Sequence, residues 1–479
     1  MAELSPDVFA TLAPEAQALI TFLLKENAEL KARIAELEAR LAKNSRNSSK
    51  PPSSDGLLKP NPKSQRERTD RKPGGQPGHK GSTLKFSSEP DHIIEHPVVE
   101  CSHCHFDLRA IQFTRTESRQ VVDLPAIKCE VTEHRIQQKQ CPHCGKITCS
   151  QFPSGVRSFV GYGERIKGFA LYLMNQQFIP YDRLKQMFFD LFAQTISRGS
   201  FHTFQKECAQ ILAPVVEGAI RDAAIGAEVA HFDETGLRCE KKNHWLHVAS
   251  GKIFTYYAVH RKRGRVAFDS IGILSSFKGV AVHDFWEPYF DYVHCKHAAC
   301  NAHILRELTF TEEECKEDWA KRMKAVLLKI HKKVEKGKQA GRSRLGPGTL
   351  KDFNREYQQV IASGTRLHST LLPLPKNRGR QKQRPGKNLL DRLDRQRNLI
   401  LAFMTDFRVP FTNNLAEQDI RMQKVKSKIS GCFRTMAGAE RFCRIRSYIS
   451  TARKQHYNVY SALQKAIRGT PWVPAISLT

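Results

Sequence analysis

The sequence is short of negative charge and of long apolar runs. Its 479 residues contain 48 Asp and Glu against 77 Lys and Arg, a formal net charge of +29. Such a surplus repels itself in a compact fold unless a polyanion neutralises it, so nucleic acid is the expected partner and an anionic membrane surface the alternative. No stretch approaches the ~18–20 consecutive apolar residues of a membrane span. The N-terminus also lacks the basic start and apolar run of a signal peptide. We therefore expect a cytoplasmic, nucleoid-associated protein without a membrane partner.

The cysteines do not suit a disulfide framework, because they number 13 and no export signal accompanies them. Four of them form two Cys-x-x-Cys pairs, Cys101 with Cys104 and Cys141 with Cys144, separated by 36 residues. Two such pairs can supply four thiolates to one tetrahedral Zn²⁺, and the strand-like alternation between them is typical of a zinc ribbon. We predict a structural zinc site at these four cysteines. Alternative ligands lie close by, at His103, His105, His143 and Cys149.

The N-terminal region carries a heptad pattern that predicts a coiled-coil helix over residues 1–43. The seam consists of Ile20, Leu23, Asn27, Leu30, Ile34, Leu37 and Leu41. A polar Asn on the seam favours pairing with a second helix over packing on the protein's own body, which is the alternative. Residues 44–90 are rich in Ser, Pro, Gly and basic residues and predict a flexible basic linker, acting either as a solubilising spacer or as a strap along phosphates.

Residues 160–222 carry helical apolar spacing interrupted by a short turn, AQTISRGS. Helix, tight turn and helix is the outline of a helix-turn-helix. Many helical pairs with this outline bind nothing, so DNA reading and simple packing both remain open for this region.

Two apolar strands each end in an aspartate. The runs VAHFD and VAVHD place Asp233 and Asp284 at matching positions, 51 residues apart with further strands between them. Strand ends of open α/β sheets are where ligands are held, and carboxylate oxygens are suitable ligands for Mg²⁺. A strand-end cap or turn former is the ordinary explanation of one such aspartate. The matched pair favours metal binding.

Phosphodiester chemistry with two metal ions calls for a third carboxylate, and the segment VPFTNNLAEQDIRMQKVKSK supplies Glu417. Its ordinary explanation is a capping box with Asn414 as the N-cap residue. However, Glu417 also heads a basic stripe on one face of the predicted helix, continued by Arg421, Lys424 and Lys428. We predict that Glu417 is a metal ligand and that the stripe contacts DNA phosphates. A solvated charged face is the alternative.

The motifs HFDETGLR, AVHDFWEPYF, CNAHILREL and VPFTNNLAEQDIRMQKVKSKISGCFRT resemble those of the DDE transposases of the insertion-sequence-66 family. The N-terminal coiled coil, the NSSKPPSSD and GGQPGHKG stretches and the paired cysteine knuckles are similar as well. The resemblance implies an RNase H-like catalytic domain with Asp233, Asp284 and Glu417 as its acidic triad. It also implies accessory proteins from the same element. Cys300 and His303 match a Cys-x-x-His pattern of related transposases, which we interpret as helix packing and not as catalysis.

The separation of 133 positions between Asp284 and Glu417 predicts a helical insertion, and this spacing leaves three rival third acids, Asp406, Asp419 and Glu440. Asp419 would point to another helix face. A basic run in the insertion is a further expected DNA contact, with a surface loop as the alternative. We name Lys376, Arg378 and Arg380 as its contacts.

The expected α/β chain has a coiled coil (1–43), linker (44–90), zinc module (91–152), helical DNA-binding domain (153–222), catalytic core (223–305), basic insertion (306–400) and core completion with C-terminal helices (401–479).

These features predict a transposase that binds the terminal inverted repeats of an insertion sequence and catalyses DNA cleavage and strand transfer. Two Mg²⁺ or Mn²⁺ ions would serve catalysis and one Zn²⁺ would be structural. One active site for each element end predicts at least a homodimer on terminal and target DNA. Two other functions fit some of the same features: a zinc-ribbon DNA-binding regulator with an inactive catalytic fold, and a structure-selective nuclease.

Overall fold

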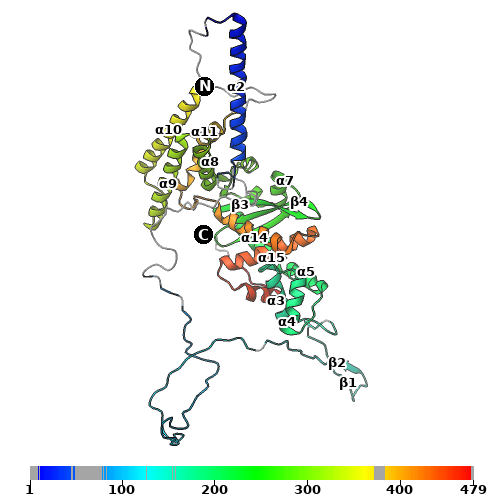
Figure 1. Cartoon of the computed structure of the whole chain (residues 1–479). Coiled ribbons are helices and arrows are strands. Elements are labelled where there is room, and N and C mark those ends of the chain that lie inside the picture. The colour runs from blue at the N-terminus through cyan, green and yellow to red at the C-terminus, as the bar shows by residue number, and fades with distance from the viewer. Residues whose placement is uncertain are drawn as a thin grey trace.

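The computed structural model describes residues 9, 11–44, 47–48, 78, 80–81, 83–125, 127–153, 155–156, 158–371 and 383–475. A compact body carries a projecting N-terminal helix and an extended segment (Figure 1). Most of the predicted linker lies outside the described residues, as do Lys376, Arg378 and Arg380. Within the described part, no helix is both long enough and apolar enough to span a bilayer.

A five-stranded mixed sheet lies at the centre of the body, which confirms the α/β expectation. The strands run in the order β5-β4-β3-β6-β7. β4 is antiparallel to both of its neighbours, whereas β3, β6 and β7 are mutually parallel. The bounds are β3 (Val229–Cys239), β4 (Lys242–Ser250), β5 (Thr255–His260), β6 (Val280–His283) and β7 (Lys296–Ala299).

Alternation along β3 divides its side chains between the two faces of the sheet. Ala230 and Phe232 pack into one core, which they share with the helices that precede the sheet. Leu237 and Cys239 pack into a second core on the opposite face. That second face is covered by α14 (Asn414–Ser430) and α15 (Met436–Lys454). The odd-numbered positions of β3 therefore face α14. Asp233 consequently points toward α14, and Glu234 points to the opposite face of the sheet.

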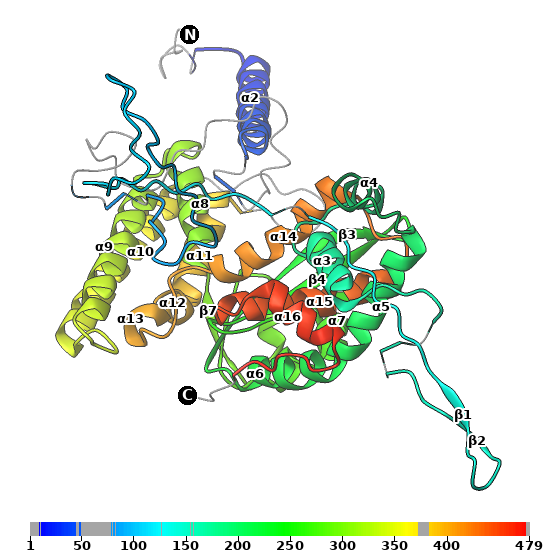
Figure 2. The same cartoon turned by 90° about the horizontal axis from the view of Figure 1, so that it is seen from below.

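A helical unit precedes the sheet and packs against its first face. α15 and α16 (Val459–Ile467) lie against α3 and α5 of this unit (Figure 2). Ser197 caps α5, because its Oγ accepts a hydrogen bond from the Ser200 N–H, and Ala193 ends α4 in the left-handed conformation. The predicted helix, turn and helix are thus confirmed as elements. Their bounds are α3 (Glu164–Asn175), α4 (Tyr181–Phe192), α5 (Arg198–Pro214), the π-helix η2 (Val215–Ile220) and α6 (Arg221–Gly226).

A second group of helices packs on the β7 side of the sheet, within the segment where an insertion was predicted. Its core contains the fully buried Trp319 and Tyr357 and reaches the sheet through Val282, Ala298 and Ala299. The bounds are α8 (Asn301–Glu313), α9 (Asp318–Gln339), α10 (Pro347–Thr370), α11 (Pro385–Arg395), α12 (Arg397–Ile400) and α13 (Ala402–Thr405). α7 (Arg265–Ile271) and the 3-10 turns η3 (Leu274–Ser276) and η4 (Glu287–Asp291) complete the body.

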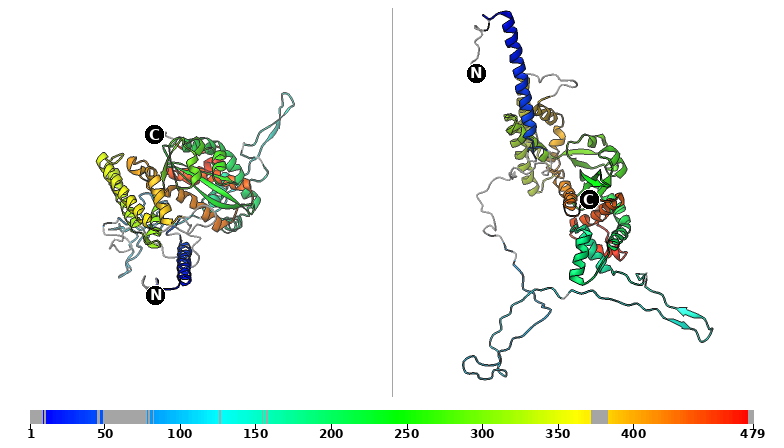
Figure 3. Two further views of the ribbon diagram at one scale, coloured as in Figure 1. Left: turned by 90° about the horizontal axis from the view of Figure 1, so that it is seen from above. Right: turned by 45° about the vertical axis from the view of Figure 1, so that its right-hand side comes forward.

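The N-terminal helix α2 (Pro14–Leu41) extends away from the body (Figure 3). Its seam is open to solvent, with exposed fractions of 53% at Leu23, 60% at Leu30 and 54% at Ile34. These seam positions therefore do not pack on the protein's own body. The base of the helix is tied to the body, where the Lys43 Nζ lies 5.1 Å from the centre of the Phe310 ring.

Residues 83–125 and 127–153 run as an extended segment whose β1 (Gln138–Gln140) and β2 (Ile147–Cys149) form a short hairpin (Figure 3). Of the two strand-like runs between the cysteine pairs, RQVVDLP forms no strand, so that expectation is wrong, whereas CEVTEHRIQQKQC contains β1 near its end. Val121 and Val131 are almost fully exposed, so their alternation has no core to pack against.

Candidate active site

Asp233 and Asp284 occupy equivalent positions on neighbouring parallel strands. The pairing of β3 with β6 joins Val229 to Val280 and His231 to Val282, a constant offset of 51 positions. The two aspartates are separated by the same 51 positions, two residues beyond the last pair. Because parallel strands keep their register, both carboxylates lie at the same end of the sheet. The two aspartates matched from sequence are therefore adjacent in space, but the expectation that both end their strands is wrong for Asp233, because β3 continues to Cys239.

Glu417 reaches this end of the sheet from the first turn of α14. The capping-box interpretation is wrong, because the N-cap residue is Asn413 and not Asn414. The Asn413 side chain does not cap the helix. Its Nδ2 donates to the Phe232 carbonyl oxygen at 2.8 Å, and its Oδ1 lies 2.9 Å from the His231 Nδ1. Asn413 therefore ties the start of α14 to β3, beside Asp233.

The three acids share one electrostatic environment. Burial raises the pKa of Asp233 to about 8, and the negative charges of Glu234, Asp284 and Glu417 contribute to the same shift. In addition, the Glu417 Oε1 is buried without a hydrogen-bond partner among the described residues. Converging carboxylates that repel one another, with one unpaired oxygen, form a site whose charge a divalent cation would neutralise. The residues present thus fit a hard cation.

Glu234 follows Asp233 but points to the opposite face of the sheet, as alternation requires. Its side chain is only 2% exposed and accepts hydrogen bonds from Arg263 at 2.6 and 2.8 Å and from the Tyr289 hydroxyl. The Arg263 guanidinium in turn lies over the Trp286 ring, 3.7 Å from its centre. Glu234 is therefore neutralised within the fold and is not free to join the triad.

The two residues of the Cys-x-x-His motif, Cys300 and His303, have different roles. Cys300 is fully buried, its Sγ accepts a hydrogen bond from the Asn413 N–H at 3.1 Å, and burial raises the pKa of its thiol to about 11. This agrees with packing. His303 does not merely pack, because its Nε2 lies 3.9 Å from the Glu417 Oε1 and ligand atoms of Cys300, His303 and Glu417 all lie within 4.8 Å of one another. Because the Cys300 Sγ is already engaged by the Asn413 N–H in the core, we assign Cys300 to packing and His303 to Glu417.

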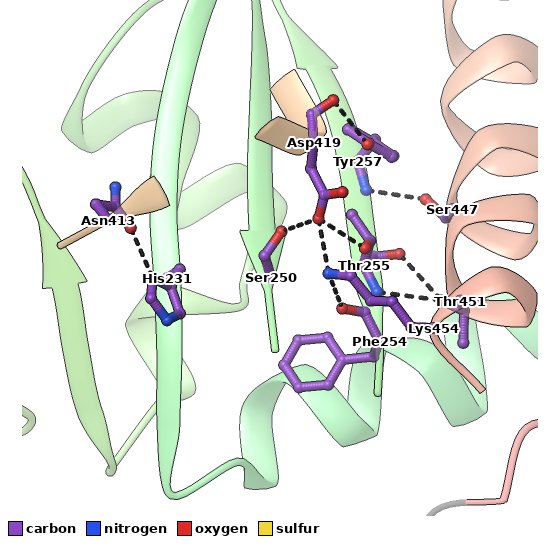
Figure 4. Close-up of polar contacts among 10 residues, drawn as sticks. All are labelled: His231, Ser250, Phe254, Thr255, Tyr257, Asn413, Asp419, Ser447, Thr451 and Lys454. Atoms are coloured by element: carbon purple, nitrogen blue, oxygen red, sulfur yellow. Dashed lines mark hydrogen bonds and ion pairs between the residues drawn. The ribbon is translucent and has the colours of Figure 1, made fainter. Parts of the chain in front are cut away.

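The three rival acids are engaged or placed elsewhere. The Asp419 Oδ2 accepts hydrogen bonds from Ser250, Thr255 and Lys454 on the far side of α14 (Figure 4). Asp406 pairs with Arg408 at 2.7 Å. Glu440 is exposed on α15. Glu417 is thus the acid of α14 that faces the two aspartates.

The basic stripe beyond Glu417 lies on the solvent side of α14. Arg421, Lys424 and Lys428 are all exposed, and the Arg421 Nη2 lies 3.8 Å from the Glu417 Oε2. The stripe is therefore continuous with the acidic end of the sheet and is open to a ligand.

The two cysteine knuckles have the same local geometry. In each, the carbonyl of the first cysteine accepts a hydrogen bond from the N–H four residues later, and its N–H donates to the carbonyl five residues later. The N–H groups of His103 and Cys104 lower the pKa of Cys101, and those of Cys144 and His143 lower the pKa of Cys141. Among the described residues, one group has metal-ligand spacing, and it is Cys300, His303 and Glu417. The structure thus forms each knuckle without bringing the two together.

Comparisons with known proteins give two family matches. Residues 160–441 match the family described as Transposase IS66 family, which covers 282 of the 479 residues and includes all three acids. Residues 3–85 match a family of unknown function, DUF6444. No curated protein matches the chain.

Proposed function

The chain belongs to the IS66 transposase family, as its motifs indicated, and from this premise we propose that it is a DDE-type enzyme that cleaves and joins DNA at Asp233, Asp284 and Glu417. The observation that carries the proposal is the register of the two aspartates, together with the approach of Glu417 from α14. Three acids that span more than 180 positions of the chain contribute to one electrostatic cluster. A structural role does not require that convergence.

The sheet supports an RNase H-like assignment for the catalytic domain. Counting strands along the chain from β3, the spatial order is third, second, first, fourth and fifth, with the second strand antiparallel to the rest. In this arrangement the first and fourth strands lie side by side at the centre of the sheet. Asp233 lies within the first of these strands, and Asp284 follows directly after the fourth.

Asp233, Asp284 and Glu417 would hold two divalent cations, Mg²⁺ or Mn²⁺. When bound, such cations activate a water nucleophile and stabilise the leaving 3′ oxygen of a phosphodiester. The reaction we propose frees a 3′ hydroxyl at each element end by hydrolysis. That hydroxyl then joins target DNA by transesterification, without a covalent protein intermediate.

The chain's own residues have separate tasks in this proposal. His303 lines the side chain of Glu417 and limits its rotamers. Arg421, Lys424 and Lys428 continue from the site along the exposed face of α14, where they would bind successive DNA phosphates. Asn413 holds the start of the helix against β3. Together these contacts would orient the DNA strand and the third acid.

The remaining modules would bind DNA ends and assemble the complex. We assign recognition of terminal inverted repeats to the zinc knuckles and to the α4–α5 unit, and self-association to the exposed seam of α2. Lys376, Arg378 and Arg380 are proposed as further DNA contacts of the insertion. Accessory proteins of the same element would complete the assembly.

The proposal is tested by incubating the purified chain with labelled element ends, target DNA and Mg²⁺. We expect cleaved ends and joined products. Asp233→Asn, Asp284→Asn and Glu417→Gln should each reduce both products by at least about a thousandfold while leaving DNA affinity within about twofold. Asp406→Asn, which removes an acid outside the site, is the matched control and should retain activity.

Other outcomes separate the alternatives. Cleavage without joining would identify a structure-selective nuclease. Binding without either reaction would identify a DNA-binding regulator with an inactive catalytic fold. Loss of DNA binding in parallel with loss of chemistry, in all three triad variants, would mean that these acids maintain the fold.

A further inference from the structure

Asp419 lies two residues after Glu417 on α14, about 200° further around the helix, so the two carboxylates point in nearly opposite directions. The Glu417 carboxylate faces His303 and the acidic end of the sheet. The Asp419 carboxylate faces β4, β5 and the end of α15 (Figure 4). We propose that Asp419 is a positioning residue for Glu417, because its ion pair with Lys454 sets the rotation of α14 about its axis. This inference rests on the proposed function.

Asp419 is held by a converging set of donors. Its Oδ2 accepts from the Ser250 Oγ at 2.6 Å, the Lys454 Nζ at 2.7 Å and the Thr255 Oγ1 at 2.9 Å. Its backbone carbonyl accepts from the Tyr257 hydroxyl at 2.9 Å. Donors from two strands and one helix thus meet on a single residue of α14. Such a set of contacts opposes rotation as well as translation.

The partner of Asp419 is itself fixed. The Lys454 Nζ also donates to the Phe254 carbonyl oxygen at 2.9 Å, and the Lys454 side chain is only 13% exposed. α15 is held to the edge of the sheet, because Ser447 accepts from the Tyr257 N–H at 2.8 Å and Thr451 accepts from the Thr255 N–H at 3.1 Å (Figure 4). Asp419 is therefore bound to a rigid support and not to a free lysine.

A second anchor lies on the other side of Glu417. The Asn413 amide group contacts β3 through its Oδ1, at His231 (Figure 4), and through its Nδ2, at the Phe232 carbonyl oxygen. The backbone N–H of Asn413 donates to the Cys300 Sγ. Glu417 thus lies between two fixed points, four residues after the first and two residues before the second. With one anchor the helix could still roll about its axis. Asn413 and Asp419 together remove that freedom.

The size of the effect follows from the width of a helix. Side chains reach about 5–6 Å from the helix axis, so a roll of about 20° displaces a carboxylate by about 2 Å. Catalytic and metal-binding groups tolerate only about 0.5 Å of displacement. A change at Asp419 that costs the fold little would therefore still move Glu417 out of place.

The test uses Mn²⁺ affinity of the full-length chain, measured by isothermal titration calorimetry, with thermal unfolding as the second readout. The variants are Asp419→Asn, Lys454→Met, their double combination and Glu417→Gln. Glu312→Gln is the control, because the Glu312–Lys324 pair is also a partly buried carboxylate–lysine pair, 26% and 29% exposed, but joins α8 to α9. Ser250→Ala provides a milder perturbation of the same network if the single charge variants unfold.

We expect Glu417→Gln to abolish part of the Mn²⁺ binding, and Asp419→Asn or Lys454→Met to weaken it by about 10- to 100-fold. The double variant should recover part of that loss, because Ser250 and Thr255 can still bind the amide oxygen introduced at position 419 and no lone charge remains buried. Ser250→Ala should weaken Mn²⁺ binding to a smaller extent, and Glu312→Gln should leave it unchanged.

Two results would overturn the inference, and they are distinguishable. If Asp419→Asn lowers only the unfolding temperature while Glu417→Gln reduces Mn²⁺ affinity, Asp419 has a structural role and the proposed active site stands. If Glu417→Gln itself leaves Mn²⁺ affinity unchanged, the proposed active site fails, and the positioning role fails with it.

Discussion

The Nε2 atom of His303 lies 3.9 Å from the Oε1 atom of Glu417, and neither the Oε1 nor the His303 Nδ1 has a hydrogen-bond partner among the described residues. Burial lowers the pKa of His303, which favours the neutral ring. Two buried polar groups with unused bonding capacity are costly unless something completes them. The contact therefore links the Cys-x-x-His motif to Glu417, the acid that lies farthest along the chain from the two aspartates.

We predict that His303→Ala reduces strand-transfer activity by about 10- to 100-fold, because Glu417 loses the ring that restricts it. DNA affinity, measured by fluorescence anisotropy, should stay within about twofold. Cys300→Ser retains an acceptor for the Asn413 N–H and is the control, with activity close to that of the unchanged chain. Equal losses in the two variants would mean that the motif serves packing alone.

A zinc site formed by both knuckles predicts one Zn²⁺ per chain. Cys101→Ser or Cys141→Ser should each remove most of it, because four thiolates are needed for a closed tetrahedral site. Zinc content is measured by atomic emission, and limited proteolysis should show faster cleavage within residues 91–152. Cys129→Ser, at a cysteine between the knuckles, should retain the metal. Full zinc content in both knuckle variants would exclude a shared site.

The exposed seam of α2 predicts self-association through this helix. Leu30→Glu together with Ile34→Glu places charges at two apolar positions that are 60% and 54% exposed in the single chain. We expect the unchanged chain to elute with the mass of at least two copies in light scattering, and the variant to shift to the mass of one. Lys31→Ala, off the seam, should have no effect. A double-Glu variant with unchanged mass would place the interface elsewhere.

Lys426 predicts a pH dependence of stability. Burial lowers its pKa to about 8, against about 10.4 for an unperturbed lysine. Between these values the unfolded chain binds a proton that the folded chain does not, so the free energy of unfolding contributed by this group rises with pH from about 8 to 10. Below pH 8 the cost of burying the charge is fully present.

We therefore expect Lys426→Met to raise the free energy of unfolding at pH 7 by about 1–3 kcal/mol. In urea titrations, the free energy of unfolding of the variant should also no longer rise between pH 8 and 9.5. Lys428→Met, at an exposed position of the same helix, is the control. A destabilised Lys426→Met would show that the contact of the Lys426 Nζ with the Phe433 ring, 3.8 Å from its centre, outweighs the cost of burial.

Much of the fold could be inferred from local pattern. The alternation in VAHFDETGLRCE and VAVHD predicted β3 and β6, and their 51-residue spacing placed Asp233 and Asp284 together. The apolar spacing after Pro180 predicted α4. β7 was not foreseen, because KHAA has four residues and no alternation, and becomes a strand only by pairing with β6. Between the cysteine pairs the opposite happened: RQVVDLP forms no strand and CEVTEHRIQQKQC forms only β1, since alternation without a core does not make a sheet.

The motifs of this chain were sufficient to identify its family and to name candidate acids, because strand alternation and helix faces follow from periods of 2 and 3.6 residues that adjacent positions encode. They could not establish which acid of α14 faces the aspartates. That choice depends on how far the helix is rotated, and the rotation is set by Asn413 on β3 and by Asp419 on Ser250 and Lys454. Asn413 and Asp419 each lie more than 160 positions from their partners on the sheet. Contacts of that range arise only when the chain has folded.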